Sequence, residues 1–209
     1  MRLSDTLTQA GKLIRHVYFP LSGMISLVQT FSDGTTTEVG LIGREGFWGS
    51  PLILGAKTSP AEAMVQGAGE AVRIPTAAFL AAVEANHDLS ARLLQYAQVL
   101  HVQVSLTAAC NGRHKVRQRL ARWLLEAQDR LGGSEVPLSH EFLSFMLGIR
   151  RAGVTAALSG LRTRGIITTN RGIVGIRNRK AVEAEACECY RIVKSETGRL
   201  LPKPARAAR

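Results

Sequence analysis

Long apolar runs are absent from this chain of 209 residues, although 45% of the residues are hydrophobic. A helix that crosses a bilayer needs about 20 consecutive apolar residues, and no segment approaches that length. The first residues also lack the apolar core of a signal peptide. These absences predict a cytoplasmic protein with no membrane partner. The length of 209 residues suits one large or two small globular domains.

Cysteine is scarce, since Cys110, Cys187 and Cys189 are the only three in the chain. Three cysteines make no disulfide framework, and one Cys-x-Cys pair is far from a complete ligand set for zinc or an iron–sulfur cluster. We therefore interpret these thiols as structural or incidental.

Motifs for catalysis and metal binding are also missing. The sequence contains no Gly-rich phosphate loop, no nucleophile elbow and no suitably spaced pair of carboxylates. Its five histidines show no metal-ligand spacing and include no His-x-His pair: His16, His87, His101, His114 and His140. We therefore expect no enzyme activity, no metal and no cofactor, with a metal-dependent β-roll enzyme as a distant alternative.

Positive charge is confined to the second half of the chain. Residues 1–112 contain 7 Lys or Arg and 8 Asp or Glu, a net charge of −1, whereas residues 113–209 contain 20 and 8, a net charge of +12. A neutral part joined to a strongly basic part is typical of a domain that binds phosphates. Because no basic helix has a bulky apolar face, nucleic acid is favoured over a membrane surface as the partner.

Residues 139–164 have the pattern of two short helices joined by a tight turn. Ser139 is a favourable N-cap, and Phe142, Phe145 and Met146 give the first helix an apolar face. Gly148 ends that helix. The second helix is predicted to bury one side, formed by Val154, Ala157, Leu158 and Leu161.

The opposite side of the second helix combines small residues with arginines. Small side chains let a helix approach the major groove closely, and arginine can bond guanine through two hydrogen bonds. Spacing alone leaves a purely structural pair of helices equally open. The side consists of Arg151, Ala152, Thr155, Ala156, Ser159 and Arg162.

A predicted β-hairpin follows this second helix. Two β-branched runs, 166–169 and 173–176, flank the turn residues Asn170-Arg171-Gly172, and together with the helices they predict a winged helix-turn-helix. This arrangement resembles the CRP/FNR family of bacterial transcription regulators, and the resemblance covers most of the chain. It implies an α+β fold with an N-terminal jelly-roll-like β-roll, a long dimerisation helix and a C-terminal winged helix-turn-helix.

The first half has the pattern of that β-roll. Strand-like runs at 14–19, 24–31 and 35–42 are separated by turn residues, shorter runs follow at 63–65 and 71–74, and a helical stretch follows at 76–84. The phrases HVYFPLSGMISLV and EVGLIGREGFWG look like the cyclic-nucleotide-binding domain of the same family. Family members have a further helix and strand before the position of Leu13. We therefore expect a roll that is short at its N-terminus, because these elements are lost or begin upstream of Met1.

The resemblance also identifies a degenerate ligand pocket. In relatives that bind cyclic AMP, a glutamate after a glycine takes the ribose, and an Arg-Ser pair takes the cyclic phosphate. Here Ser50 follows Gly49 at the glutamate position, and Ala61 and Glu62 stand at the arginine and serine positions. Because Glu62 has the same charge sign as a phosphate, we expect no response to cyclic AMP. The roll then senses an unknown small-molecule effector or serves as a ligand-independent scaffold.

Residues 86–110 predict one long helix. Apolar positions alternate by four and three residues, which is typical of a coiled-coil seam and predicts a homodimer. The alternative is that the same residues form a core within one chain. Val99, Val102 and Leu106 are expected to pack on the roll. The predicted seam consists of Leu89, Leu93, Tyr96, Leu100, Gln103, Thr107 and Cys110.

Four segments result: a sensor roll (1–85), a dimerisation helix (86–112), a winged helix-turn-helix domain (113–193) and a disordered basic tail (194–209). The third segment opens with a helix over 114–131 and closes with one over 177–193. A solvated basic face is predicted at Arg113, Lys115, Arg117, Arg119 and Arg122.

The resemblance implies a DNA-binding regulator that binds pseudo-palindromic double-stranded DNA as a homodimer, with RNA polymerase as a further candidate partner. Ser139, Arg150, Arg162 and Arg171 are expected to contact phosphates. Arg151 is expected to read a base, with weaker contacts from Thr155 and Ser159. The alternative function is a small-molecule-binding regulatory module whose helix-turn-helix contacts protein. The operator, the controlled genes and the direction of regulation stay open.

Overall fold

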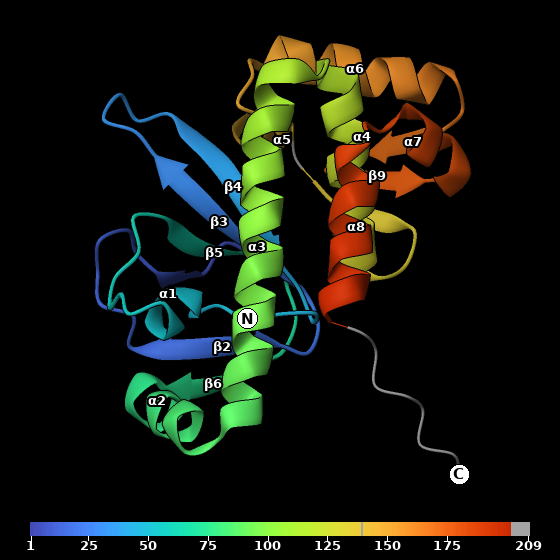
Figure 1. Cartoon of the computed structure of the whole chain (residues 1–209). Helices are drawn as coiled ribbons and strands as arrows, with labels where there is room; N and C mark the ends of the chain where they lie inside the picture. Colours follow the sequence, from blue (N-terminus) through green and yellow to red (C-terminus); the bar gives the residue numbers. More distant parts are fainter. Residues whose placement is uncertain (139, 202–209) are drawn as a thin grey trace.

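The chain forms a β-roll, a long helix and a helical C-terminal domain that contains a small sheet (Figure 1). The structure is a computed structural model and describes residues 1–138 and 140–201. The long helix α3 (His87–Arg113) runs along both parts, so the roll and the C-terminal domain lie along the same helix.

The roll consists of two antiparallel sheets. The larger sheet has the order β1-β5-β3-β4, and the smaller sheet pairs β2 with β6. Two short helices, α1 (Ser50–Ile53) and α2 (Thr76–Ala85), complete the roll. Its strands are β1 (Thr6–Thr8), β2 (His16–Pro20), β3 (Met24–Thr30), β4 (Thr36–Ile42), β5 (Glu62–Gly67) and β6 (Ala71–Pro75).

Two elements of the roll were not predicted, the short helix α1 and the strand β1. Strand β1 lies before Leu13 and pairs with β5, with Thr6 opposite Met64. The expectation that the roll lacks its preceding strand is therefore wrong, while no helix occurs in the described residues before Leu13. A strand of three residues is too short to show the alternation that identifies a half-buried strand in a sequence.

Aromatic rings fix α3 to the roll. The Phe47 ring stacks on Phe19 and contacts Tyr96 of α3, with 5.2 Å between the ring centroids in each pair. A Cβ atom at Gly46 would lie 1.9 Å from the Tyr96 ring, so only glycine allows this close approach. The roll and α3 therefore share one apolar core.

The predicted dimer seam of α3 faces its own chain. Leu93, Tyr96 and Leu100 are buried in the core of the roll, and Leu89 packs against that core. The Gln103 side-chain oxygen accepts a hydrogen bond of 2.7 Å from the Leu41 amide. The predicted role of this stripe in dimerisation is therefore wrong, and the alternative of an intrachain core is correct. Spacing by four and three identifies a buried stripe, but the partner that buries it is set by tertiary packing.

The C-terminal domain builds a second core around α4 (Val116–Leu131), with fully buried Trp123, Leu124, Leu143 and Leu147. Its three-stranded sheet has the order β7-β9-β8. The remaining elements are β7 (Glu135–Pro137), α5 (His140–Leu147), α6 (Arg151–Thr163), β8 (Ile167–Asn170), β9 (Ile173–Ile176), α7 (Arg179–Glu185) and α8 (Cys189–Leu200).

The end of the chain differs from the prediction of one helix and a disordered tail. The backbone of Ala186 is extended, so it separates α7 from α8. Helix α8 continues to Leu200 and packs along α3, with Tyr190 and Val193 buried. Residues 194–200 are therefore helical, because apolar anchors hold a segment that composition alone marks as basic and polar. The rest of the predicted tail, 202–209, lies outside the described residues.

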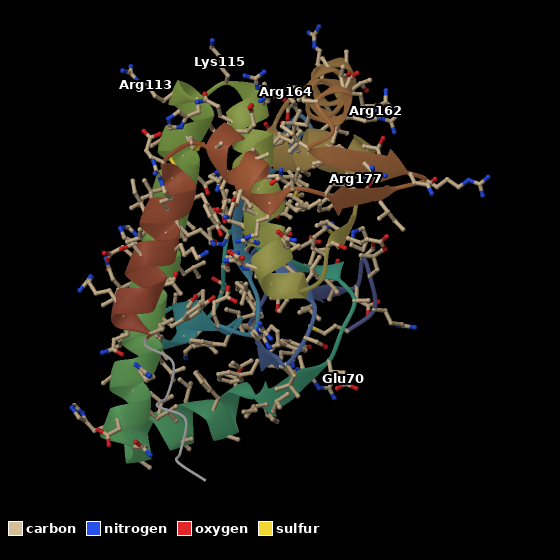
Figure 2. All side chains as sticks on the ribbon, turned by 90° about the vertical axis from the view of Figure 1, so that its right-hand side faces the viewer. Glu70, Arg113, Lys115, Arg162, Arg164 and Arg177 are labelled. Atoms are coloured by element: carbon tan, nitrogen blue, oxygen red, sulfur yellow. The ribbon has the colours of Figure 1, made fainter. Side chains whose placement is uncertain are left out.

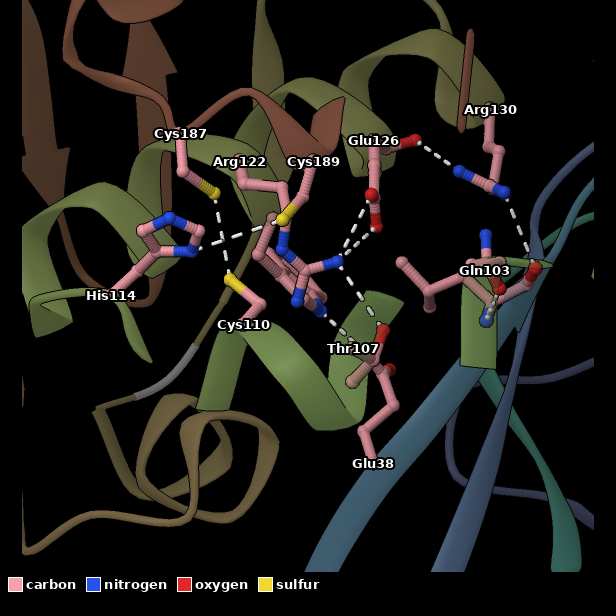
Figure 3. Close-up of polar contacts among 12 residues, drawn as sticks. Glu38, Gln103, Thr107, Cys110, His114, Arg122, Glu126, Arg130, Cys187 and Cys189 are labelled. Atoms are coloured by element: carbon pink, nitrogen blue, oxygen red, sulfur yellow. Dashed lines mark hydrogen bonds and ion pairs between the residues drawn. The ribbon is translucent and has the colours of Figure 1, made fainter. Parts of the chain in front are cut away.

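Two arginines of the predicted basic face are buried. Arg119 and Arg122 are 7% and 4% exposed, and the Arg119 guanidinium donates to the Leu147 carbonyl. Arg122 forms a buried ion pair with Glu126, at 3.0 Å, and also donates to Thr107 of α3. The solvated-face prediction is wrong for both residues, since Arg119 is turned toward the end of α5 and Arg122 toward α3 (Figure 3).

A buried carboxyl connects the roll to α4. The indole nitrogen of Trp123 and the hydroxyl of Ser26 each lie 2.6 Å from an oxygen of Glu38 on β4. Burial raises the pKa of Glu38 from 4.5 to about 8, despite these hydrogen bonds. A neutral carboxyl suits the site, because one oxygen can accept from Trp123 while the other hydrogen-bonds Ser26.

We expect Glu38 to make stability depend on pH. The folded state keeps a proton that the unfolded state releases between pH 4.5 and about 8, so the free energy of unfolding should fall as pH rises through this window and level off above it. Glu38→Gln keeps the shape without titrating and should flatten the dependence. Chemical denaturation at pH 5, 6.5 and 8 measures this, with exposed Glu135→Gln as control. Equal slopes in both variants would contradict the assignment.

Candidate nucleic-acid interface

Helices α5 and α6 form the predicted helix-turn-helix. Gly148 has a φ of +58°, and its amide donates to the Phe145 carbonyl, so the turn uses a conformation that favours glycine. Ser139, the predicted N-cap and phosphate contact, lies outside the described residues. The predicted apolar face needs one correction, because Phe145 is 43% exposed and the buried positions among residues 142–147 are Leu143, Met146 and Leu147.

Helix α6 has one buried and one exposed side, as its periodicity predicts. The buried side consists of Val154, Ala157, Leu158 and Leu161. The other side carries Ser159, which is half-buried, and the exposed residues Arg151, Ala152, Thr155, Ala156 and Arg162. This surface is shallow, since its central side chains are small, and an arginine stands near each end.

The hairpin of β8 and β9 presents Arg171 at its tip. Asn170 pairs with Ile173, so Arg171 and Gly172 form a two-residue turn with φ values of 36° and 81°. Positive φ at both turn residues is the geometry that matches the twist of a hairpin. The turn therefore directs an exposed arginine away from the sheet, in the position of a wing.

Basic side chains gather at the end of the molecule that carries these elements. Figure 2 shows Arg113, Lys115, Arg162, Arg164 and Arg177 toward that end, and Glu70 on the roll at the other end. Arg164 is paired with Glu185. It is therefore a weaker candidate for binding a phosphate than the exposed Arg162.

Glu185 also pairs with Arg117, at 2.9 Å. This carboxylate partly neutralises one edge of the basic surface, between α4 and the end of α6. Arg150 of the turn, Arg162 of α6 and Arg171 of the wing are exposed and lie outside this pair.

The degenerate ligand cassette is closely packed within the roll. Gly49 has a φ of +133° and lies against Val17, and the neighbouring Ser50 is 6% exposed. Ala61 is also buried, and its amide donates to the Ser59 hydroxyl. The Glu62 carboxylate accepts a hydrogen bond of 3.0 Å from Thr6 of β1. The position expected to hold a phosphate-binding serine thus carries a negative charge engaged with β1.

The structure brings together cysteines that the sequence shows as scattered. Cys110, Cys187 and Cys189 are all buried, and with His114 they place four potential ligand atoms within 4.8 Å of one another. A hydrogen bond from the Cys187 thiol lowers the pKa of Cys110. The interpretation as structural or incidental thiols did not foresee that the three cysteines lie together with His114. Cys110-x3-His114 at a helix end, with a distant Cys-x-Cys, was the available signal.

Sequence comparison identifies two known domains. The profile of the cyclic nucleotide-binding domain matches residues 2–86, and that of the Crp-like helix-turn-helix domain matches residues 118–185. Neither of these two matches is to a catalytic family. No curated protein is similar enough in sequence to count as a match.

Solved structures share the fold over nearly the whole chain. A CRP-family transcriptional regulator from Thermus thermophilus has a TM-score of 0.75 at 21% identity, with 89% of this chain and 95% of that chain covered. FixK2 from Bradyrhizobium japonicum has a TM-score of 0.76 at 18% identity, covering 89% and 94%. The c-di-GMP responsive regulator CLP from Xanthomonas campestris has a TM-score of 0.65 at 16% identity, covering 84% and 91%.

A cyclic-nucleotide-binding-like roll joined through a long helix to a winged helix-turn-helix defines a class of regulator. The chain belongs to the CRP/FNR family of transcriptional regulators, as its sequence resemblance indicated. In the part of the chain that the structure describes, no helix is both long and apolar enough to cross a membrane.

Proposed function

We propose that this protein is a sequence-specific DNA-binding transcription regulator that acts as a homodimer on pseudo-palindromic operators in the cytoplasm. One observation carries the proposal: the exposed side of α6 is shallow, begins with an arginine and lies beside a wing in the basic half of the chain. Such a surface suits insertion into the major groove while flanking arginines hold the backbone.

Phosphate contacts are assigned to Arg150 in the turn, Arg162 near the end of α6 and Arg171 at the wing tip. All three are exposed. Ser139 stays a prediction for the same role. Each neutralised phosphate releases counterions, so the affinity for any duplex should fall steeply as salt rises.

Base reading is assigned mainly to Arg151 in the first turn of α6. By the register of the family, Ala152 stands where many members carry glutamate and Ala156 where many carry arginine. Neither methyl group can donate or accept a hydrogen bond, so we infer that this protein does not read the operators of those members. Thr155 and Ser159 supply weaker contacts.

The dimer contact is reassigned to the exposed side of α3. A stripe on this side follows a spacing of four and three residues, and its small members Ser105 and Ala108 would allow two helices to approach closely. Leu94 is 45% exposed and offers an apolar contact at one end. The stripe consists of Leu94, Gln98, His101, Ser105 and Ala108.

Cyclic AMP is not assigned as the effector. Ala61 offers no charge to a phosphate, and Glu62 offers the wrong charge. One similar structure is that of a c-di-GMP responsive regulator, and another is that of a putative cAMP-binding regulatory protein. The shared fold therefore leaves the effector open.

The alternative function, in which the helix-turn-helix contacts protein, is disfavoured by the net charge of +12 on residues 113–209. RNA polymerase remains a candidate partner.

Arg151→Ala should weaken binding to the specific site by about 1–3 kcal/mol and change binding to random duplexes little, because a base contact is lost. Titration of both duplexes with the purified protein measures this, with exposed Arg199→Ala of α8 as control. An equal loss on both duplexes would reassign Arg151 to a phosphate.

Ser105→Glu should convert the dimer to a monomer, since two-fold symmetry would bring like charges together across the α3 stripe. The matched substitution Ser144→Glu, on half-buried Ser144 of α5, should leave the dimer intact. Sedimentation velocity measures both variants. A stable dimer of Ser105→Glu would place the contact elsewhere.

Cyclic AMP should not bind the roll, because phosphate burial beside Glu62 is unfavourable. Calorimetric titration of the purified protein, followed by DNA binding with and without the nucleotide, measures this. Micromolar binding together with a change in DNA affinity would contradict the assignment.

A further inference from the structure

Three segments that are distant in the sequence meet at the end of α3. Cys110 lies in the last turn of α3, His114 is its C-cap residue, and Cys187 and Cys189 enclose the start of α8. All three cysteines are buried, and Leu106 packs over them. Figure 3 shows these four side chains turned toward one another beside Arg122.

The spacing of the ligand atoms fits a single tetrahedral ion. The sulfurs of Cys110 and Cys187 are 3.5 Å apart, and the Cys189 sulfur lies 3.8 Å from Nδ1 of His114. Zinc bonds of about 2.3 Å to sulfur and 2.0 Å to nitrogen at tetrahedral angles require edges of about 3.8 and 3.6 Å. We propose that Cys110, His114, Cys187 and Cys189 bind one Zn²⁺ ion as a structural site.

An outer contact orients the histidine for this role. Nε2 of His114 lies 3.4 Å from the Glu188 carboxylate, while Nδ1 faces the cysteines. A metal-bound histidine commonly donates its other ring N–H to a carboxylate, which fixes the tautomer and the ring plane. Glu188 stands between the two cysteine ligands in the sequence, so one short segment supplies two sulfurs and this support.

The surroundings also supply compensating charge. Three thiolates and Zn²⁺ together carry one negative charge, which is costly to bury alone. The guanidinium of Arg122 is buried next to the cluster and interacts electrostatically with Cys110. Its Nε atom has no hydrogen-bond partner in the described part of the chain, so one buried donor is left for the thiolate shell.

A disulfide accounts for less of this geometry. A Cys110–Cys187 bond would use two of the four ligand atoms and would leave the Cys189–His114–Glu188 arrangement without a role. The zinc site uses every member. It would fasten α8 to α3 at the point where α3 gives way to α4, and so hold the C-terminal domain in one position relative to the long helix.

Metal analysis of the full-length protein, purified under reducing conditions, tests the proposal. We expect about one zinc per chain, and Co²⁺ replacing it should give sulfur-to-cobalt charge-transfer absorption with the strong visible bands of a tetrahedral site. His114→Ala and Cys189→Ser should lower zinc affinity by at least ~100-fold in competition with a chromophoric chelator. His87→Ala, at an exposed histidine in the first turn of α3, should leave the zinc affinity unchanged.

Glu188→Gln provides a variant that keeps all four ligands and needs no repacking of the core. It should retain one zinc per chain with an affinity ~10- to 100-fold lower. The proposal would be overturned if the reduced wild-type protein took up neither Zn²⁺ nor Co²⁺, or if the His114 and Cys189 variants bound as tightly as wild type. A Cys110–Cys187 disulfide in protein purified under reducing conditions, with Cys189 still a free thiol, would also overturn it. None of these measurements depends on DNA binding.

Discussion

The Arg122–Glu126 ion pair is buried where the roll, α3 and the C-terminal domain meet, and the relation between these parts depends on it. Removing one partner of a buried ion pair typically costs about 3–5 kcal/mol, because the other charge stays buried and unpaired. Arg122 also donates to Thr107 of α3, and the Arg130 guanidinium one turn beyond Glu126 donates to the Leu41 carbonyl of β4. Because each of these buried polar groups needs its hydrogen-bond or ion-pair partner, the domains can adopt few positions relative to each other.

This junction connects the roll to the helix-turn-helix in physical terms. Glu38 of β4 contacts Trp123, which lies in the core that also holds the buried side of α6. Arg119 contacts the carbonyl of Leu147, the last residue of α5. A change in the roll would therefore reach the helix-turn-helix through α4, and the proposed zinc ion would hold the same junction from the side of α8.

The sequence predicted the order of domains, most strands, the helix-turn-helix and the exposed side of α6, because each depends on local periodicity and turn chemistry. The predictions failed for residues whose burial or position is decided by contacts with a distant segment of the chain. The four-and-three stripe of α3 could face a second chain or the roll, and Tyr96 on Gly46 settles it for the roll. The charge of Arg122 suggests a solvent-exposed residue, but in the structure the side chain is buried in an ion pair with Glu126. Cys110 and Cys187 are 77 residues apart in the sequence, and only the tertiary fold places their sulfurs in contact.

In the proposed function, α6 reads DNA sequence within a symmetric pair of chains. Selection from a library of random-sequence duplexes with the full-length protein, followed by sequencing, tests it most directly. We expect enrichment of one pseudo-palindrome with half-sites about one helical turn apart. We also expect the affinity for the enriched site to fall by orders of magnitude between about 50 and 200 mM salt. A pool that stays random after repeated rounds, or binding that ignores salt, would contradict the account.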